Sequence, residues 1–474
     1  MHRKIAIVLM CICSINTMLC NESRPNRVEI DLFLQDVVRS YNIPALSVSI
    51  VDSKNIINSF NWGNTDNGLP ITSDIPFFLG STSKTFTALG IMRLVEQGKI
   101  RLDDPVKKYL PDFKIENKEY ETQITIRHLL NHTSGLSGKD IRGTSMGLNN
   151  LEEEMELLMT CNPVNTPGTH YEYFNSNYRL LGLLIERVSG TSFQNFMYRE
   201  VFNPLGMSKT SAGLIAGIDP VCGHGQILGQ PIKSKQIFRK GAVPSGYIIS
   251  TTGDVSKFLI EQLKANNGDT TVLNKETIRK TWKPSDNSNG YALGWLAITD
   301  SIGNKFYIHG GALEGYQSFF YINPDKDIGF VILMNQGGLF PMMSFSVIRD
   351  GLISIINGEQ PNLGMQKIPV ILTIIVLLLV CLFYRYRVIR LRQKPKFNLF
   401  RKLNLIFDLA LVIFLIVGFI PLMNRLMGDQ ADWSMLWNVL PEFCLLLAII
   451  CIGNIICASI KIKQFLTRQT NRSY

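Results

Sequence analysis

Two hydrophobic patterns divide this chain of 474 residues. Up to about residue 360, apolar positions recur every second residue or every third to fourth residue, which is typical of the strands and helices of a globular domain. The pattern predicts helices at 28–41 and 343–356. Period-two runs predict strands at 45–51, 56–62, 293–299, 305–309, 317–322 and 328–334. Strands at both ends of a largely helical segment favour an α+β domain, in which helices flank one antiparallel sheet and an all-helical region is inserted.

Beyond residue 365 the apolar positions are no longer periodic. Three nearly uninterrupted apolar runs cover 368–384, 403–423 and 435–460, and each is close to the ~20 residues that a helix needs to cross the hydrocarbon core of a membrane. We therefore expect three transmembrane helices in a region that spans 366–474. Buried helices of a soluble protein would have to produce three such runs, and the charge asymmetry described next, by coincidence.

The charged residues give this membrane region a direction. The chain has 48 Lys and Arg, 38 Asp and Glu and a net charge of +10. Residues 361–474 alone hold 14 bases and 4 acids, and 14 − 4 accounts for the whole excess. Eight of these bases lie in 385–402 and four follow residue 460, so the positive-inside rule places both segments in the cytoplasm. The balanced charge of 1–360 leaves no field to hold a polyanion, which argues against nucleic-acid binding.

The N-terminus independently predicts export. Arg3 and Lys4 precede an apolar run over 5–20, which has the charged head and short core of a secretory signal. We therefore expect a signal peptide or an uncleaved anchor at 1–20, an exported domain at 21–365 and a cytoplasmic C-terminus. The chain is then a multi-pass protein of the cell membrane with an extracytoplasmic domain.

Four other residues are interpreted from their position alone. Asp408 and Glu442 lie near the ends of their predicted spans, where a carboxylate can reach the membrane interface. Cys161 and Cys222 are the cysteines outside the apolar runs, so the exported domain has at most one disulfide. Two unpaired thiols are an equal alternative.

The strongest chemical signal is the segment 80–84, which reads G-S-T-S-K and opens a predicted helix. Because Ser81 and Lys84 are three residues apart, the amine lies on the same helix face as the hydroxyl and can reach it. The helix N-terminus also favours negative charge that develops on the serine oxygen. An isolated S-x-x-K is usually an N-cap serine followed by a surface lysine, so the motif gains weight only from its companions.

Two companions follow along the chain. Tyr173 and Asn175, two residues apart on an expected extended loop, project to one side and supply a proton carrier and a substrate-positioning amide. His309 is expected to end a strand and begins the run 309–312, which reads H-G-G-A. Glycines there let a substrate backbone approach, and a main-chain N–H can complete an oxyanion hole.

The three elements, in this order, resemble those of the serine β-lactamase and penicillin-binding protein superfamily, in particular its class C β-lactamase-like and D-alanyl-D-alanine carboxypeptidase branch. Ser81 and Lys84 match the S-x-x-K motif of that superfamily. Tyr173 and Asn175 match its Y-x-N motif, and 309–311 matches the H-x-G variant of its K-T-G strand. Stretches that look similar and are expected to support the fold lie at 102–105, 126–136, 204–207 and 291–295.

The resemblance covers roughly residues 28–358 and implies a β-lactamase/transpeptidase-like fold and acyl transfer through a serine. It makes Ser81 the nucleophile, and Lys84 and Tyr173 the groups that relay its proton, without deciding which of the two is the base. It implies no metal and no organic cofactor. The residues that it places in substrate binding, with the main-chain N–H of the last one in the oxyanion hole, are Asn175, His309, Gly311 and Ala312.

Two departures from the family pattern bear on the substrate. Residues 244–247 read P-S-G-Y where the family often has a small-Gly-Gly run, so we expect a narrower edge of the site at Tyr247. His309 stands where the best-studied β-lactamases have lysine, and a neutral imidazole anchors a carboxylate weakly. We therefore expect poor turnover of penicillins and better turnover of peptides or esters.

Two other motifs compete with this interpretation. Ser145 lies in 143–147, which matches the G-x-S-x-G nucleophile elbow of α/β-hydrolases, but the residues before it are polar and glycine-rich instead of a buried strand. His128 and His132 have the spacing of a zinc pair. Without a glutamate between them or an evident third ligand, we expect a structural role for both.

The sequence thus predicts a membrane-bound, extracytoplasmic serine hydrolase that acts on D-alanyl peptides, esters or β-lactams. The alternative is a slowly deacylating sensor of β-lactams or wall peptides, although the cytoplasmic segments leave no room for an output domain. A degenerate hydrolase domain is disfavoured because all three catalytic elements are intact. The sequence leaves the oligomeric state open.

Overall fold

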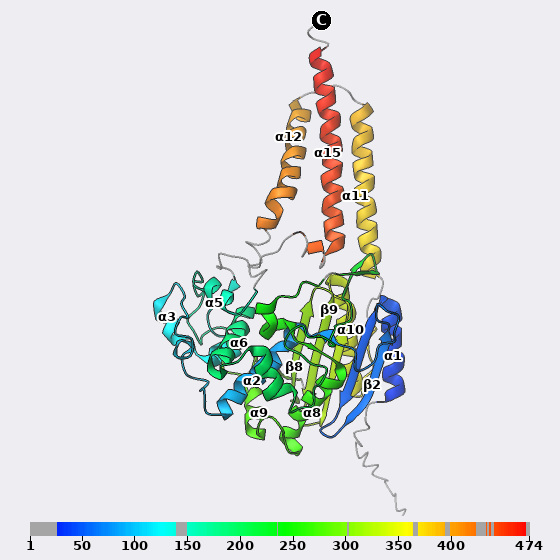
Figure 1. Ribbon diagram of the computed structural model, residues 1–474. Helices are drawn as coiled ribbons and strands as arrows, with labels where there is room; N and C mark the ends of the chain where they lie inside the picture. The colour runs from blue at the N-terminus through cyan, green and yellow to red at the C-terminus, as the bar shows by residue number, and fades with distance from the viewer. Residues whose placement is uncertain are drawn as a thin grey trace, which may run out of the picture.

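The computed structural model describes residues 26–138, 149–234, 236–300, 303–363, 368–393, 399–422, 433, 436–437 and 440–470. Figure 1 shows a domain built around a sheet and three long helices that extend away from it. The predicted signal segment at 1–20 and the competing serine, Ser145, lie outside the described residues.

The domain is built on one antiparallel sheet with the strand order β2-β1-β10-β9-β8-β7. These strands are β1 (Ala45–Val51), β2 (Ile56–Gly63), β7 (Leu296–Thr299), β8 (Lys305–Leu313), β9 (Tyr316–Asn323) and β10 (Ile328–Met334). Distant parts of the chain meet in the sheet because β1 pairs with β10, where Ser49 lies opposite Val331. The predicted α+β fold with an antiparallel sheet is thereby confirmed.

One strand is longer than the sequence pattern predicts. His309 does not end β8, because the strand continues to Leu313 and pairs with β9 along its whole second half. The glycines at 310 and 311 hid this continuation, since glycine is unfavourable in strands unless another group approaches closely. The candidate site residues after His309 therefore belong to a fixed strand and not to a loop.

Helices cover both faces of the sheet. On one face, α1 (Arg27–Tyr41) and α10 (Leu339–Ile356) pack against alternate strand residues such as Phe330 and Ile332. On the other face, α2 (Ser83–Glu96) and α8 (Thr252–Asn267) pack against Phe320 and Val331. Because successive side chains of a strand point to opposite faces, the same strands serve both apolar layers.

The segment between β2 and β7 supplies the predicted helical region. It also contains two small antiparallel pairs, β3 (Phe77–Phe78) with β6 (Ile249–Ser250) and β4 (His224–Ile227) with β5 (Gln230–Lys233). The remaining helical elements are η1 (Gly80–Thr82), η2 (Val106–Lys108), α3 (Lys118–Gln123), α4 (Ile126–Leu130), α5 (Glu152–Leu158), α6 (Asn175–Ser189), α7 (Phe193–Met197), η4 (Tyr198–Phe202), η5 (Lys240–Ala242), η6 (Val243–Tyr247) and α9 (Lys275–Thr281).

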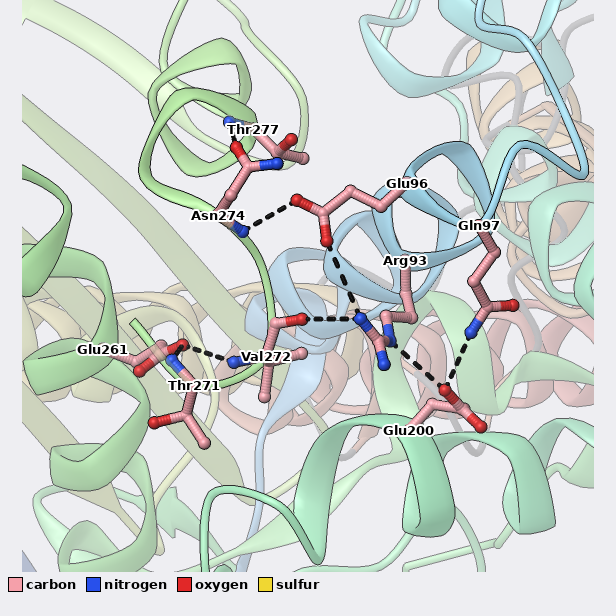
Figure 2. Close-up of polar contacts among 9 residues, drawn as sticks. All are labelled: Arg93, Glu96, Gln97, Glu200, Glu261, Thr271, Val272, Asn274 and Thr277. Atoms are coloured by element: carbon pink, nitrogen blue, oxygen red, sulfur yellow. Dashed lines mark hydrogen bonds and ion pairs between the residues drawn. The ribbon is translucent and has the colours of Figure 1, made fainter. Parts of the chain in front are cut away.

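The C-terminal end of α2 is anchored by polar contacts that Figure 2 shows. Arg93 donates from Nε to Glu200 Oε2 at 3.2 Å and from Nη1 to the carbonyl oxygen of Val272 at 3.1 Å. Gln97 Nε2 donates to the same Glu200 oxygen at 2.9 Å. These contacts fix the far end of the helix whose first turn follows the S-x-x-K serine.

Four described helices are long and apolar enough to cross a membrane. The first is α10, which buries Phe345, Ile348 and Leu352 against α1 and the sheet and so belongs to the domain. The other three are α11 (Ile368–Gln393), α12 (Leu399–Ile413) continued by η7 (Phe414–Gly418), and α15 (Pro441–Thr470). The residue ranges of these three helices overlap the three apolar runs of the sequence. In the structure, α15 packs between the other two helices.

Asp408, which we interpreted as able to reach the membrane interface, has its carboxylate paired among the long helices. Its side chain is fully buried between the long helices. Its Oδ1 accepts from Arg387 of α11 at 3.0 Å, and its Oδ2 accepts from Lys461 of α15 at 2.7 Å. Two cations from neighbouring helices hold this carboxylate inside, since a buried carboxylate needs both charge compensation and hydrogen bonds.

Glu442 lies near the end of its helix, as its position in the sequence indicated, and contacts the domain there. It lies in the first turn of α15 and is 7% exposed. Its Oε1 accepts a hydrogen bond at 2.8 Å from the main-chain N–H of Leu228, in the turn between β4 and β5. This carboxylate therefore joins a membrane helix to the domain.

The two domain cysteines form no disulfide. Cys161 is buried and its Sγ lies 3.6 Å from the carbonyl oxygen of Ser137, whereas Cys222 is half-buried beside Gly223. The sequence left open one disulfide or two thiols, and in the structure both cysteines are thiols.

Candidate active site

Ser81 lies in η1, a tight turn between β3 and α2. Gly80 starts this turn with φ +55°, a left-handed conformation that glycine adopts at no steric cost. The carbonyl oxygen of Leu79 accepts from the Thr82 hydroxyl at 2.8 Å and from the Ser318 hydroxyl of β9 at 2.5 Å. The Ser81 side chain is half-buried, and the turn that carries it is hydrogen-bonded to β9 of the sheet.

The second half of β8 passes in direct contact with this turn. A Cβ atom on Gly311 would lie 2.2 Å from the Leu79 carbonyl oxygen and 3.0 Å from the Ser81 nitrogen. A Cβ atom on Gly80 would lie 2.6 Å from the Ala312 nitrogen. Only glycine fits at either position. The close approach brings the main-chain nitrogens of Ser81 and Ala312 near each other, so both are candidates for an oxyanion hole.

Lys84 lies one turn into the helix and is fully buried. Its Nζ is 3.2 Å from Ser81 Oγ, 2.7 Å from Asn175 Oδ1 and 2.7 Å from the carbonyl oxygen of Ser245 in η6. The amide and carbonyl oxygens can only accept hydrogen bonds. A neutral amine has two N–H groups, which these two oxygens use, so its lone pair is left for the serine hydroxyl.

The charge state of Lys84 follows from the same surroundings. Lys84 forms no ion pair with any described acidic side chain, in contrast to most buried lysines. Burial lowers its pKa well below the usual value of 10.5, and the positive charge of Arg179 lowers it further. Arg179 itself is paired with the buried carboxylate of Glu154 at 2.8 Å. The site therefore favours a neutral amine beside Ser81.

Tyr173 and Asn175 reach this centre from the start of α6. Asn175 is the first residue of that helix and not part of an extended loop, although Phe174 before it is extended. The Tyr173 ring centroid lies 4.9 Å from Lys84 Nζ. Burial raises the pKa of the Tyr173 phenol, and a hydrogen bond with Ser81 opposes that shift. With 40% of the residue exposed, Tyr173 lies at the open side of the site and carries its proton at neutral pH.

His132 belongs to this group, which the sequence analysis missed. Its Nδ1 accepts from the Phe174 N–H at 3.2 Å and lies 3.1 Å from Asn177 Nδ2. A neutral ring then carries its proton on Nε2, which is buried and has no hydrogen-bond partner among the described residues. The ring lies 4.4 Å from that of Tyr173, centroid to centroid. The only sequence signal for a role at the site was that His132 lies in the 126–136 stretch, which resembles the family. The spacing of four residues between His128 and His132 suggested metal binding instead.

His309 is buried in β8, and its tautomer is set by two neighbours. Its Nδ1 lies 2.8 Å from the Gly310 carbonyl oxygen and must donate there, while its Nε2 accepts from the Tyr291 hydroxyl at 2.8 Å. Burial is the main cause that lowers the pKa of His309 to about 3. Both ring nitrogens are thus used within the protein, and the ring is neutral at physiological pH. Tyr291 was not predicted as a site residue.

Tyr247 does not narrow the edge of the site as expected. Its ring is 3% exposed and packs edge-on against Phe78 and Phe238. Arg239 donates to its hydroxyl. The apolar ring is buried because it completes the aromatic cluster beneath β3, whereas the main chain at Ser245 faces Lys84.

The two histidines that are four residues apart have different surroundings. His128 caps α4, where the Thr125 main-chain N–H donates to His128 Nδ1 at 3.3 Å and the His128 N–H donates to the Thr125 hydroxyl at 3.2 Å. Within the described ranges, no group of at least three His, Cys, Asp or Glu side chains is arranged to hold a metal ion. His128 thus has the structural role that we predicted, and His132 lies at the site.

Comparison with known proteins assigns the class to which this site belongs. Residues 30–344 match the family model for Beta-lactamase. The match covers more than half of the chain, and the chain therefore belongs to the β-lactamase family. It is a member of the serine β-lactamase and penicillin-binding protein superfamily, whose members are serine hydrolases, as the motifs predicted.

Individual relatives are distant. Protein flp of Staphylococcus aureus (strain NCTC 8325 / PS 47) is 28% identical over 327 residues, which are 67% of this chain and 64% of that protein. The similarity thus spans less than two thirds of that relative's length. Penicillin-binding protein 4 of Amycolatopsis lactamdurans is 28% identical over 287 residues, which are 57% of this chain and 74% of that protein.

A solved structure supports the same fold. The octameric penicillin-binding protein homologue from Pyrococcus abyssi superimposes with a TM-score of 0.60 and 26% identity, over 70% of this chain and 78% of that one.

Proposed function

We propose that this protein is a membrane-bound hydrolase that forms an acyl-enzyme on Ser81. The observation that carries the proposal is the geometry around Lys84, whose Nζ lies 3.2 Å from Ser81 Oγ and 2.7 Å from each of two uncharged acceptor oxygens, with no described acidic side chain paired to it. An amine held in this way is a base whose lone pair faces the hydroxyl that it has to activate.

In the proposed mechanism, Ser81 Oγ attacks the carbonyl carbon of the substrate and its proton passes to Lys84. The negative charge on the carbonyl oxygen is stabilised by the main-chain N–H groups of Ser81 and Ala312. Tyr173, which keeps its proton at neutral pH, protonates the leaving alcohol or amine and recovers a proton from Lys84. Lys84 is therefore the base and Tyr173 the acid, a choice that the motifs alone left open.

Release of the acyl group repeats these steps with water. Water attacks the acyl carbon, Lys84 takes one of its protons, and Ser81 leaves with a proton as the acid product departs. Asn175 keeps Lys84 in place through the 2.7 Å contact and offers its amide to the substrate.

Covalent labelling tests the nucleophile. A fluorophosphonate or a fluorescent penicillin is expected to label the native protein, and Ser81→Ala is expected to abolish labelling. Ser145→Ala is the matched control and should label like the native protein. Labelling that persists in Ser81→Ala, or that is lost only in Ser145→Ala, would move the nucleophile away from Ser81.

We infer that the substrate is a peptide or ester and not a penicillin. Neutral His309 offers no N–H to a ligand, because its nitrogens face Gly310 and Tyr291. A β-lactam carboxylate therefore lacks the cation that would anchor it there, and the C-terminal carboxylate of a D-Ala-D-Ala peptide lacks it equally, whereas D-alanyl esters and peptides without a free carboxylate at this point do not need one. Turnover of a D-Ala-D-Ala peptide, a D-alanyl ester and a chromogenic β-lactam would be compared in the native protein and in His309→Lys. We expect His309→Lys to raise β-lactam turnover about tenfold. An unchanged rate, or faster native turnover of penicillin than of any peptide or ester, contradicts the inference.

We further propose that the domain is extracytoplasmic and the C-terminus cytoplasmic. The eight bases in 385–402 support this orientation. Protease added to intact cells should digest the domain and spare an epitope on the C-terminal tail. An epitope that is accessible from outside would contradict the proposed number of crossings.

A further inference from the structure

The strand directions place the candidate site at one particular end of the sheet. β8 ends at Leu313, and the chain returns in β9 from Tyr316. Ala312 pairs with Gln317, which pairs with Met334 near the end of β10. Ala312 thus lies in the last rows of the sheet, two residues or fewer from the turn that closes this end.

The β4–β5 hairpin connects that end of the sheet with the membrane helices. The N–H of His224, at the start of β4, donates to the Asn335 carbonyl oxygen at 2.9 Å, directly after β10. The His224 carbonyl oxygen accepts from the Gly337 N–H at 2.8 Å. A Cβ atom on Gly315, in the β8–β9 turn, would lie 3.0 Å from the His224 nitrogen. The base of the hairpin therefore touches the turn that follows the candidate oxyanion hole.

The other end of the hairpin touches two membrane helices. The Leu228 N–H donates to Glu442 Oε1 of α15 at 2.8 Å, and a Cβ atom on Gly229 would lie 3.5 Å from Val370 of α11. Leu228 follows His224 by four residue steps, which in a strand cover about 13 Å. The site thus lies close to the ends of the helices that we place in the membrane, on the side of the domain that faces them.

Large apolar side chains are exposed on the same side. Leu339, Met342 and Met343 form the first turns of α10 and are 50%, 50% and 43% exposed. This helix end follows Gly337, which bonds to β4, and α10 also contacts β4 directly. The three side chains are not needed for the core, because α10 packs on the sheet through later residues such as Ile348 and Leu352. Clustered exposed apolar residues usually mark an interaction surface.

We propose that this first part of α10 rests in the leaflet on the domain's side of the bilayer, and that the acyl donor of Ser81 is an amphiphile: an ester or amide whose alcohol or amine part is anchored in that same leaflet. The occupant is a lipid surface because the exposed side chains begin two residues after Gly337, which bonds to the hairpin that contacts α15 and α11. A site without a cation for a carboxylate must obtain substrate binding energy elsewhere, and a shared leaflet supplies it by concentrating the substrate. The inference rests on the proposed acyl-enzyme chemistry at Ser81.

The test uses the full chain in lipid nanodiscs and two D-alanyl esters with the same reacting bond, one on a short soluble alcohol and one on a diacylglycerol anchor. Labelling by fluorophosphonate is measured first. The native protein is expected to have a kcat/KM at least about tenfold higher for the anchored ester. The double variant Leu339→Gln/Met342→Gln should lose most of this preference and keep its activity on the soluble ester.

The matched control is Val28→Gln/Leu32→Gln on α1, whose side chains are 65% and 58% exposed. They precede Asn42, which bonds to Gly229 of the hairpin, by ten or more residues, or about 15 Å of helix. The control should keep the preference. Two outcomes would overturn this inference and leave the proposed acyl-enzyme function intact. In one, the native protein is labelled by fluorophosphonate but does not prefer the anchored ester. In the other, the Leu339→Gln/Met342→Gln variant loses activity on both esters equally. If the patch variant does not fold, the native comparison still decides. Native protein that does not label overturns the proposed function as well.

Discussion

The two regions of this molecule each bury a lysine, and their surroundings differ. Lys461 in the membrane region is 2% exposed and lies 2.7 Å from a carboxylate oxygen of Asp408, whose other oxygen binds Arg387. Lys84 in the domain is 0% exposed and contacts only uncharged oxygens. The paired lysine shares a carboxylate with Arg387 and joins helices, whereas Lys84 has no acidic partner among the described residues and its pKa is lowered by burial.

The comparison separates structural from chemical use of the same residue type. The Asp408 cluster joins α11, α12 and α15, and Asn454 extends it by donating to the Tyr384 hydroxyl at 2.7 Å. All its charges are compensated or lie near the predicted cytoplasmic end. The charge of Arg179, which is paired with Glu154, lowers the pKa of Lys84 in addition to burial. Burial of a lysine is therefore informative only together with its partners.

The largest expected effect is that of Lys84→Met. Removal of the base should lower the rate of Ser81 acylation about 10³-fold, while folding is retained, because a side chain of similar length replaces a buried amine that has no counterion. The rate of labelling by fluorophosphonate and the thermal unfolding temperature measure the two effects. Full activity in a folded Lys84→Met protein would remove the distinction between the two lysines.

Lys461→Met should show the opposite pattern. Breaking a buried ion pair leaves Asp408 partly uncompensated and is expected to cost about 3 kcal/mol of stability in the membrane region, with Ser81 labelling unchanged. The measurement is the unfolding of the helices in nanodiscs, with protease resistance as the readout. The control Lys461→Met/Asp408→Asn removes this pair but leaves Arg387, which is 21% exposed, without its carboxylate, so it should regain only part of the loss. Equal resistance of single variant and native protein would argue that the pair contributes nothing.

The pH dependence sharpens the comparison further. Because the folded-state pKa of Lys84 is lowered, acylation should rise as this amine loses its proton and should level off well below pH 10.5. The unfolded chain binds more protons than the folded one between the lowered pKa and 10.5, so the free energy of unfolding also rises with pH there. Lys84→Met should lack that rise. His309, with a pKa of about 3, should add no inflection between about pH 5 and 8. A rate that climbs until pH 10.5 would mean that Lys84 is not held neutral.

The smallest expected effect is that of Arg93→Ala at the far end of α2. This side chain is 34% exposed and bridges Glu200 and Val272 (Figure 2). Its loss should lower the free energy of unfolding by about 1–2 kcal/mol while Ser81 labelling is kept. Arg187→Ala is the control, since its pair with Glu152 is about half exposed on both sides and should contribute under about 0.5 kcal/mol. A loss of labelling in Arg93→Ala would show that the anchor also positions the serine.

Local patterns predicted most of the elements. β1 and β10 have the predicted bounds, α1 differs by one residue, and the membrane helices lie over the apolar runs. The predictions were wrong where a contact between residues far apart in the chain overrode the preference of the local sequence. β8 continues past His309 because its glycines allow the strand to touch the Ser81 turn, and Asp408 stays inside because Arg387 and Lys461 reach it.

The sequence by itself determined the family, the candidate nucleophile and its lysine, since S-x-x-K, Y-x-N and H-x-G depend on short spacings that a single element preserves. Only the tertiary structure decided what surrounds them: that Lys84 has no carboxylate beside it, that His132 and Tyr291 join the site, and that His309 faces inward. Those properties depend on contacts between residues far apart in the chain. The pKa of a side chain is set by such contacts and by burial, and neither can be read from its neighbours in sequence.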